Sequence, residues 1–409
     1  MEVVVPAAEV ARERRRAKRE RSEEPSVGFV VEKIAALRRS RPSVPRDISL
    51  ARWLEYLSRS EAENEDRLCE ALGLLERAVA VASKTRRVPR CWLRDVRRLR
   101  LLLAAAAAGP RPAVATRVVP IVSAEEACLG RFLRLGTPVL VRGGGDVVFG
   151  SRRWTLETLF DELPPDAVAE IKEPAPGRWA GLEVRRTCAA RDFVAAPRGY
   201  LHDWSLPRHA PGLLDGISIP RWIAGDYLQR CGETPYAGAW PSLFVGPQGT
   251  RSALHVDAHA THFAMALASG AKDWRVWPAD RAPFLGPRFS DTSEDLLFDD
   301  DDRPAPFEIT QLPGDLIVVP SNCPHAVDNA DTTVALAINF VNATNADDFL
   351  ESFAIAADDD LPRCCGEDAI HRLRADLRYL AETDPPHFLR WRDHLPWPAW
   401  QQLCCKHKR

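Results

Sequence analysis

The segment Leu254-His255-Val256-Asp257 says more about this chain than any other stretch of its sequence. His255 and Asp257 stand at positions i and i+2, so on a β-strand their side chains point to the same face. His325, from a distant part of the chain, would complete a set of two imidazoles and one carboxylate. Such a set binds Fe(II) on one side and leaves coordination positions open for a substrate and oxygen. The sequence therefore predicts a metal site built on a β-fold.

The composition is that of a soluble globular protein. The chain has 409 residues, 45% of them hydrophobic and 27% charged, which is enough for two or three domains. It has no apolar run long enough to cross a bilayer, and its charged N-terminus lacks the apolar core of a signal peptide. The ten cysteines form no C-x-x-C pair, and we interpret them as reduced thiols. We therefore expect a nuclear or cytoplasmic protein that does not associate with membranes.

Charge is distributed unevenly along the chain. Residues 1–100 hold 24 Lys and Arg against 16 Asp and Glu, and subtraction from the totals of 55 and 57 leaves 31 against 41 for the remainder. A basic N-terminal segment followed by an acidic remainder indicates that the N-terminal segment could bind a protein or a nucleic acid. The simpler interpretation is a solvated helical surface, and both remain open from the sequence.

The N-terminal quarter of the chain has helical periodicity. Residues 1–26 are dense in charge and are expected to form a basic, disordered arm. Residues 27–110 predict a helical domain, in which Leu68, Leu72 and Leu75 fall on one helix face. The spacing of residues 48–50, 74–77 and 98–104 resembles the front half of a cyclin box. The alternative is a generic helical bundle that serves docking or stability.

Strand-like segments follow a linker at residues 111–120, which prolines mark. From residue 121 to 345, short segments rich in β-branched and aromatic residues alternate with Gly and Pro. Many short strands in one continuous block predict a closed or sandwiched β-fold. We expect a short helix after Trp154 and strands at 137–143, 242–245, 253–256, 274–277, 315–319 and 334–341.

Six linked motifs in this block resemble the Jumonji-C (JmjC) domain, a double-stranded β-helix of the cupin type. The predicted fold class is therefore α+β: a JmjC jelly-roll barrel at 121–345, preceded by the helical domain and followed by C-terminal helices at 346–409. The motifs are Thr137-to-Gly143, Leu243-Phe244-Val245-Gly246-Pro247, His255-Val256-Asp257, Gly270-to-Pro278, Pro313-to-Pro320, and Pro324-to-Asn329 with Asn339-Phe340.

The resemblance implies a site for Fe(II) and the cosubstrate 2-oxoglutarate. His255, Asp257 and His325 would bind iron, and 2-oxoglutarate would chelate it through its 2-oxo acid end. The far carboxylate of 2-oxoglutarate needs a buried cation, and Lys272 lies where the family places that lysine. Iron would activate O2 while 2-oxoglutarate is converted to succinate.

The rest of the cosubstrate pocket matches the family less completely. Ser252 would help to hold the far carboxylate, and Asn339 would hydrogen-bond within the pocket. Where related domains commonly offer a polar side chain, this chain has Met265 and Ala337. Substitute donors are expected among Thr261, Tyr227 and Tyr236.

Two further histidines, His259 and His262, follow the metal motif. They could compete as ligands through the run His255-x3-His259-x2-His262. Their spacing instead favours a loop or helix beyond the metal strand.

The resemblance implies a dioxygenase, and we expect a hydroxylase of a protein side chain, with a modified RNA base as the second substrate class. No zinc-finger reader pattern accompanies the barrel, which favours hydroxylation over histone demethylation. The alternatives are a JmjC histone demethylase and a catalytically silent JmjC module that serves as a binding or regulatory protein. Substrate contacts are expected around the barrel mouth, from 200–204 and 290–303. The C-terminal helices would pack on the barrel or form a homodimer.

Overall fold

The chain divides into two compact units, residues 1–109 and 110–409. Each unit has a hydrophobic core of its own. This computed structural model describes residues 27–39, 47, 50, 51, 54, 65–83, 96, 99, 100, 103, 117–175, 178–231, 236, 238–279, 305–350, 367–383 and 395–406.

The N-terminal unit contains two described helices, α2 (Val27–Arg39) and α4 (Glu65–Ser83). Leu68 and Leu75 are buried and Leu72 is half-buried, which confirms the predicted apolar stripe on α4. The arm at 1–26 and most of the other predicted helices lie outside the described residues. The cyclin-box resemblance remains a prediction.

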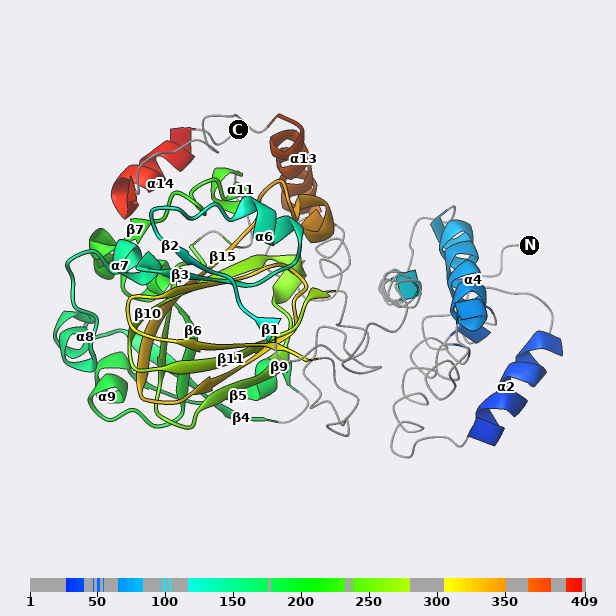
Figure 1. Ribbon diagram of the computed structural model, residues 1–409, viewed down its shortest axis with the longest axis horizontal. Coiled ribbons are helices and arrows are strands. Elements are labelled where there is room, and N and C mark those ends of the chain that lie inside the picture. The colour runs from blue at the N-terminus through cyan, green and yellow to red at the C-terminus, as the bar shows by residue number, and fades with distance from the viewer. Residues whose placement is uncertain are drawn as a thin grey trace. The chain divides into compact units, whose positions relative to one another are not determined.

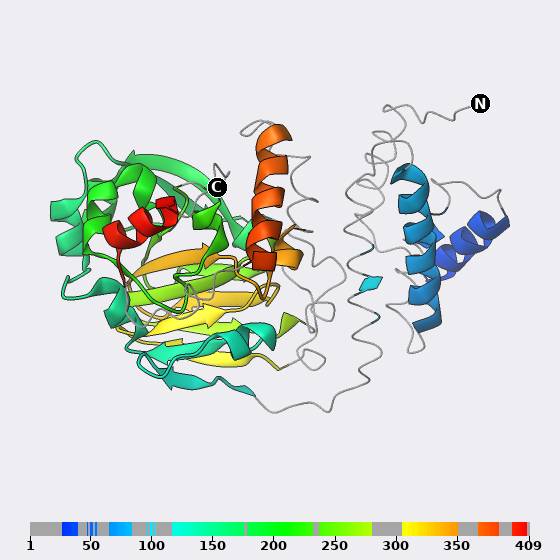
Figure 2. The same cartoon turned by 90° about the horizontal axis from the view of Figure 1, so that it is seen from above.

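The second unit is built on two β-sheets that face one another, with helices around them (Figures 1 and 2). The smaller sheet has the order β1 (Arg117–Val118), β12 (Phe307–Gln311), β11 (Lys272–Val276), β14 (His325–Asn329) and β9 (Arg251–His255). The larger has the order β2 (Ile121–Ser123), β3 (Val139–Arg142), β13 (Leu316–Val319), β10 (His262–Ser269), β15 (Thr333–Phe340), β8 (Ser242–Gly246), β6 (Tyr200–Ser205), β4 (Val168–Pro174) and β5 (Leu182–Ala189).

The central strands of the larger sheet have a hydrophobic core on each face. On β10, Phe263 and Met265 point into the core between the sheets, whereas Ala264 and Ala266 point into the core under the helices. The same alternation along β15 buries all of its residues. A strand covered on both faces has continuous rather than alternating apolar sequence. This arrangement is the jelly-roll barrel that the motifs predicted.

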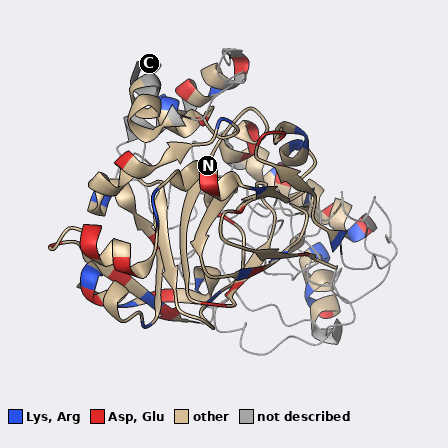
Figure 3. Ribbon diagram, turned by 60° about the vertical axis from the view of Figure 1, so that its left-hand side comes forward, with Lys and Arg blue, Asp and Glu red and all other residues tan. Residues whose placement is uncertain are grey.

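Helices and short turns cover the outer face of the larger sheet (Figure 1). Figure 3 shows charged positions gathered mainly on this periphery, while most of the barrel's strands carry few. These helices and turns are α6 (Gly130–Arg134), α7 (Gly144–Phe149), α8 (Leu156–Glu162), α9 (Ala190–Ala195), α10 (Leu206–His209), η3 (Pro211–Gly216), α11 (Tyr227–Arg230), α13 (Glu367–Thr383) and α14 (Trp397–Lys406). Two short turns lie elsewhere: η2 (Trp179–Gly181) packs against β9 of the smaller sheet, and η4 (Ala258–Ala260) lies between β9 and β10.

The C-terminal segment includes a strand as well as helices. β16 (Leu395–Pro396) pairs with β7 (Ser218–Ile219), and α14 then packs on η3 and α11. Trp397 and Trp400 are buried in the outer core. The C-terminal helix α14 therefore packs on the barrel, and homodimerisation remains a prediction.

Two segments differ from the predicted connections. Residues 200–204, expected to contribute substrate contacts at the barrel mouth and not predicted as a strand, form most of strand β6 (Tyr200–Ser205), which pairs with β4 and β8. The sequence of β6 does not alternate regularly between apolar and polar residues, because the β6–β8 register shifts at His202 and Asp203. Inside the expected linker at 111–120, β1 pairs with β12. Residues 290–303 lie outside the described part of the chain.

Candidate metal and cosubstrate site

Two neighbouring strands and one strand end bring the predicted metal ligands together. His255 ends β9 and His325 begins β14, and the two residues are partners across the antiparallel pair. Asp257 follows β9 in an extended conformation (φ −68°, ψ 155°), which keeps its side chain on the face of His255. Asp257 Oδ1 lies 3.9 Å from Nε2 of each histidine. All three ligand atoms lie within 4.8 Å of one another, close enough to share one ion.

Backbone carbonyls fix the tautomers of both imidazoles. His255 Nδ1 lies 2.7 Å from the Ala253 carbonyl oxygen, and His325 Nδ1 lies 3.0 Å from the Cys323 carbonyl oxygen. Because a carbonyl only accepts, each Nδ1 carries the proton and donates it. Each Nε2 therefore presents a lone pair toward Asp257, which is the arrangement that metal-binding histidines use.

Burial makes this cluster suited to a cation. The side chains of His255, His325 and Asp257 are only 5%, 3% and 10% exposed. Burial and the nearby His325 hold the pKa of His255 well below 6.5, so its imidazole is neutral. Burial raises the pKa of Asp257 to about 6, against the opposing attraction of His325. A bound cation would relieve the cost of burying the Asp257 charge, and two imidazoles with one carboxylate suit Fe(II).

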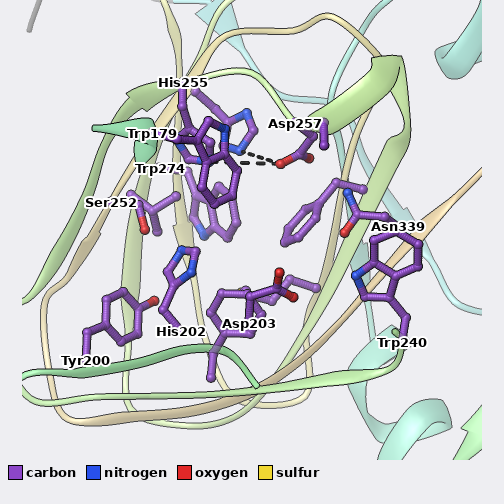
Figure 4. Close-up of a pocket in the computed structure, with 16 residues that line it drawn as sticks. Trp179, Tyr200, His202, Asp203, Trp240, Ser252, His255, Asp257, Trp274 and Asn339 are labelled. Carbon is purple, nitrogen blue, oxygen red and sulfur yellow. Dashed lines mark ion pairs between the residues drawn. The ribbon is translucent and has the colours of Figure 1, made fainter. Parts of the chain in front are cut away.

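The triad lies on the wall of a cavity of about 540 Å³, a volume that includes the solvent at its mouth (Figure 4). Aromatic rings form much of the lining, and the polar lining residues are the metal ligands together with side chains from β6, β9 and β15. Trp179 stands over His255 with ring centroids 4.9 Å apart, and its indole N–H donates to the Val256 carbonyl. The other aromatic lining residues include Tyr200, Trp240, Phe244, Phe263 and Trp274.

Lys272 is a fully buried cation with neutral partners. Its ammonium donates to Asn329 Oδ1 at 2.6 Å and to Tyr200 Oη at 3.2 Å. Burial lowers the pKa of Lys272 to about 7. No carboxylate in the described part of the chain pairs with it. A buried ammonium without an anion indicates a place for an anionic ligand.

Tyr200 connects this lysine to the cavity. Lys272 is not among the lining residues, whereas Tyr200 and Ser252 are, and their hydroxyl groups lie close enough to influence each other. Burial raises the pKa of Tyr200 to about 12, so the phenol stays protonated. A carboxylate in the cavity could therefore meet two hydroxyl groups with the ammonium directly behind them. Tyr200 is a polar contact that the motif comparison missed.

The remaining predicted cosubstrate residues lie in different places. Asn339 lines the cavity beside Asp257, and its amide donates to Thr261 Oγ1 at 2.9 Å. Met265 also lines the cavity and is the cross-strand partner of Ala337. The expected substitute donors do not line it. Thr261 instead donates to the Ala258 carbonyl, Tyr227 lies in the outer core, and Tyr236 stacks on Trp240.

Two polar residues of β6 complete the cavity, and both belong to the segment 200–204 in which substrate contacts were expected. His202 is buried, and its Nδ1 lies 3.4 Å from the Lys172 ammonium. Burial, with Lys172 and His255 nearby, holds the pKa of His202 well below 6.5. Asp203 has φ +59°, a left-handed conformation that Asp tolerates better than most residues, and its Oδ1 accepts from Ser242 at 2.7 Å. In Figure 4 its carboxylate points into the cavity.

The other two histidines of the motif region are not part of the cluster. His262 begins β10, where its ring accepts from the Ser321 backbone N–H and contacts Thr344 Oγ1 at 2.8 Å. His259 lies in η4 with a positive φ. Among the described residues, the ligand cluster contains His255, Asp257 and His325.

Comparison with known proteins found curated relatives that match the chain. No family model matches the sequence. The lysine-specific demethylase JMJ21 of Arabidopsis thaliana is 29% identical over 238 residues, which are 51% of this chain and 23% of that protein. The human 2-oxoglutarate and iron-dependent oxygenase JMJD4 is 29% identical over 163 residues, 37% of this chain and 39% of that protein. Its Danio rerio counterpart is 27% identical over 212 residues, 46% of this chain and 49% of that protein. The chain thus spans less than half the length of each.

Proposed function

We propose that this chain is an Fe(II)- and 2-oxoglutarate-dependent dioxygenase of the JmjC type, a proposal that its similarity to 2-oxoglutarate and iron-dependent oxygenases supports. The observation that carries the proposal is the convergence of His255, Asp257 and His325 with both Nε2 lone pairs directed at one point. A histidine pair with only a structural role would not require that both Nδ1 atoms donate to backbone carbonyls and both Nε2 atoms face the same carboxylate. The convergent ligands argue against the alternative of a catalytically silent binding module.

Different residues of the cavity would serve different functions in such a reaction. His255, Asp257 and His325 would hold the iron, and Tyr200, Ser252 and Lys272 would receive the far carboxylate of 2-oxoglutarate. Bound iron would supply the activation of O2 that couples decarboxylation of 2-oxoglutarate to oxidation of a substrate C–H bond. The aromatic walls would limit the access of water once a substrate closes the mouth, which would strengthen the electrostatic contacts inside.

We propose that the substrate is a protein side chain and that the enzyme acts as a hydroxylase. The Asp203 carboxylate, held at the cavity wall by a strand irregularity, supports a basic side chain as the group it recognises. The Asp203 carboxylate also attracts the Lys172 ammonium, which opposes the lowering of the Lys172 pKa by burial. A cationic substrate group would therefore interact with a carboxylate that Lys172 already partly neutralises. One relative's name specifies lysine and another, the arginine-specific demethylase JMJ22 of Arabidopsis thaliana, specifies arginine. A demethylase would oxidise an N-methyl group in the same cavity and release formaldehyde.

The first test measures succinate formed from 2-oxoglutarate by the iron-loaded protein. Loss of a metal ligand in His255→Ala should lower the rate by more than about 100-fold and weaken metal binding in calorimetry. The matched control is His209→Ala, which removes an exposed histidine on α10 outside the cavity. Wild-type protein that forms no succinate, or His255→Ala protein with the wild-type rate, would refute the proposal.

The second test concerns the substrate. Asp203→Asn keeps the Oδ1 acceptor for Ser242 but removes the charge. We expect it to raise the KM of a lysine- or arginine-containing peptide about tenfold or more, while succinate formation without peptide is unchanged. Mass spectrometry of the peptide then separates the addition of one oxygen from the loss of a methyl group. An unchanged KM would exclude Asp203 as the recognition group, and oxidation of RNA alone would exclude a protein substrate.

A further inference from the structure

The buried ammonium of Lys272 has a polar partner that does not reach the cavity. Asn329, the last residue of β14, is 2% exposed, and its Oδ1 lies 2.6 Å from the ammonium. Asn329 is not among the residues that line the cavity. Its effect on a ligand is therefore indirect, through the Lys272 ammonium and the neighbouring Tyr200 hydroxyl.

The hydrogen bonds of the Asn329 amide fix its orientation. Oδ1 accepts from Lys272 and also from Thr333 Oγ1 at 3.0 Å, while Nδ2 donates to Thr250 Oγ1 at 2.7 Å. Thr250 in turn donates its hydroxyl hydrogen to the Pro247 carbonyl, so it has only acceptor capacity left for Asn329. A flipped amide would set its NH2 group against the ammonium. The carbonyl oxygen is thereby held toward Lys272.

The backbone around Asn329 is equally constrained. Its N–H donates to the Thr250 carbonyl at 2.9 Å, and its carbonyl accepts from Gly249 at 2.9 Å. Gly246 on β8 packs directly against the side chain, because a Cβ there would lie 2.1 Å from Asn329 Nδ2. Only glycine allows this approach without moving the amide. The amide is thus fixed from three neighbouring segments of the chain.

We propose that Asn329 is the positioning residue of the cosubstrate site: it holds the Lys272 ammonium in place without neutralising it, so that the full charge remains for the far carboxylate of 2-oxoglutarate. The inference rests on the proposed function. A neutral acceptor holds a cation in place through one strong hydrogen bond but does not neutralise its charge. The cation can therefore still pair with the carboxylate of a ligand. An aspartate at the same position would lose the hydrogen bond to Thr250 but would form an ion pair with the ammonium, so the ligand carboxylate would have to compete.

The variant Asn329→Asp tests this, because it changes the charge with almost no change in shape. The probes are 2-oxoglutarate and 2-oxopentanoate, which has the same carbon chain without the far carboxylate, titrated by calorimetry into the full chain loaded with Mn(II). We expect Asn329→Asp to weaken 2-oxoglutarate binding about 100-fold, to the level of 2-oxopentanoate, with little change in 2-oxopentanoate binding. Mn(II) affinity should stay at the wild-type value.

Two further variants keep the test decisive. Asn342→Asp makes the same substitution at a half-buried turn position outside the cavity, where the side-chain oxygen accepts hydrogen bonds from Thr344, and should keep wild-type selectivity. Gly246→Ala should displace the amide and reduce selectivity without adding a charge. If Asn329→Asp retains the wild-type preference, or weakens both oxo acids equally, Asn329 has a structural role and the inference fails. If the wild type binds neither oxo acid, the proposed function itself fails.

Discussion

In its protonated form, Lys272 carries a charge that its own surroundings do not balance. Its partners are a phenol and an amide, and burial lowers its pKa from 10.5 to about 7. Between these two values the unfolded chain binds a proton that the native protein does not. The stability of the ligand-free protein therefore increases as the pH rises through this window. An anionic ligand has the opposite preference, since it favours the protonated ammonium.

This conflict predicts proton uptake when 2-oxoglutarate binds. At about pH 8 the ligand-free Lys272 is largely neutral, so binding should take up close to one proton, and the affinity should fall as the pH rises further. Titration calorimetry in buffers with different ionisation enthalpies measures this uptake. Lys272→Met should abolish it, and equal uptake in that variant would assign the proton to another group.

Among the individual site residues, those that lie within recognisable motifs were predicted from the sequence. His255, Asp257 and Lys272 belong to one continuous run whose spacing specifies their faces. Tyr200 and Asn329 could not be assigned, because their roles depend on which strands pair and on a side chain that approaches from elsewhere. A signal for Asn329 did exist, since it stands four residues after His325 in the same short strand.

Among the elements, short strands with apolar runs were predicted well. β8, β9, β11, β13 and β15 occur where they were expected, with ends displaced by one or two residues. Alternation and turn residues are local properties, and so they can be read from sequence. β6 was missed because its irregularity places polar residues where alternation requires apolar ones. That irregularity is also what turns Asp203 toward the cavity.

The helix α7 packs so closely on the barrel that it requires glycine. The Gly145 N–H donates to the Gly314 carbonyl at 2.8 Å, and a Cβ at Gly145 would lie 2.8 Å from the Asp315 carbonyl oxygen. Gly145→Ala should therefore lower the free energy of unfolding by about 2 kcal/mol, because backbone atoms cannot yield as a flexible side chain can. Denaturation in urea measures this value.

Gly212 provides the matched control for that substitution. It lies in η3, and a Cβ there would meet nothing within 4 Å. Gly212→Ala should leave the midpoint of unfolding within experimental error of the wild type. A Gly145→Ala protein as stable as Gly212→Ala would show that α7 can move away from the 313–315 turn.

For the whole molecule, the two units have separate cores. The buried residues of the N-terminal unit, such as Val30, Leu54 and Leu75, form one cluster, and the barrel has two clusters of its own. A chain that begins at Pro110 should therefore unfold cooperatively and keep succinate formation without substrate at the wild-type rate. Activity on a protein substrate would show whether the basic N-terminal region contributes to docking. An insoluble or inactive truncated protein would refute the independence of the barrel.

No described helix is long and apolar enough to span a membrane. The localisation of the protein and the partner of its N-terminal region remain predictions from the sequence, because neither leaves a mark on the architecture of a single chain. A charged surface is compatible with many different binding partners, so its charge does not identify one of them. A buried core, in contrast, packs in one arrangement, which the structure shows directly.

The attachment of β16 and α14 to the barrel affects how the protein is made. The Trp397 N–H donates to the Ile217 carbonyl, and the Trp400 indole donates to the Ala224 carbonyl at 3.0 Å, so residues near the C-terminus fill the outer core. A nascent chain on the ribosome cannot complete that core until these residues leave the exit tunnel. Premature stop codons upstream of Leu395 would thus release a barrel with an open apolar seam, a substrate for chaperones and proteases even though every metal ligand had been translated.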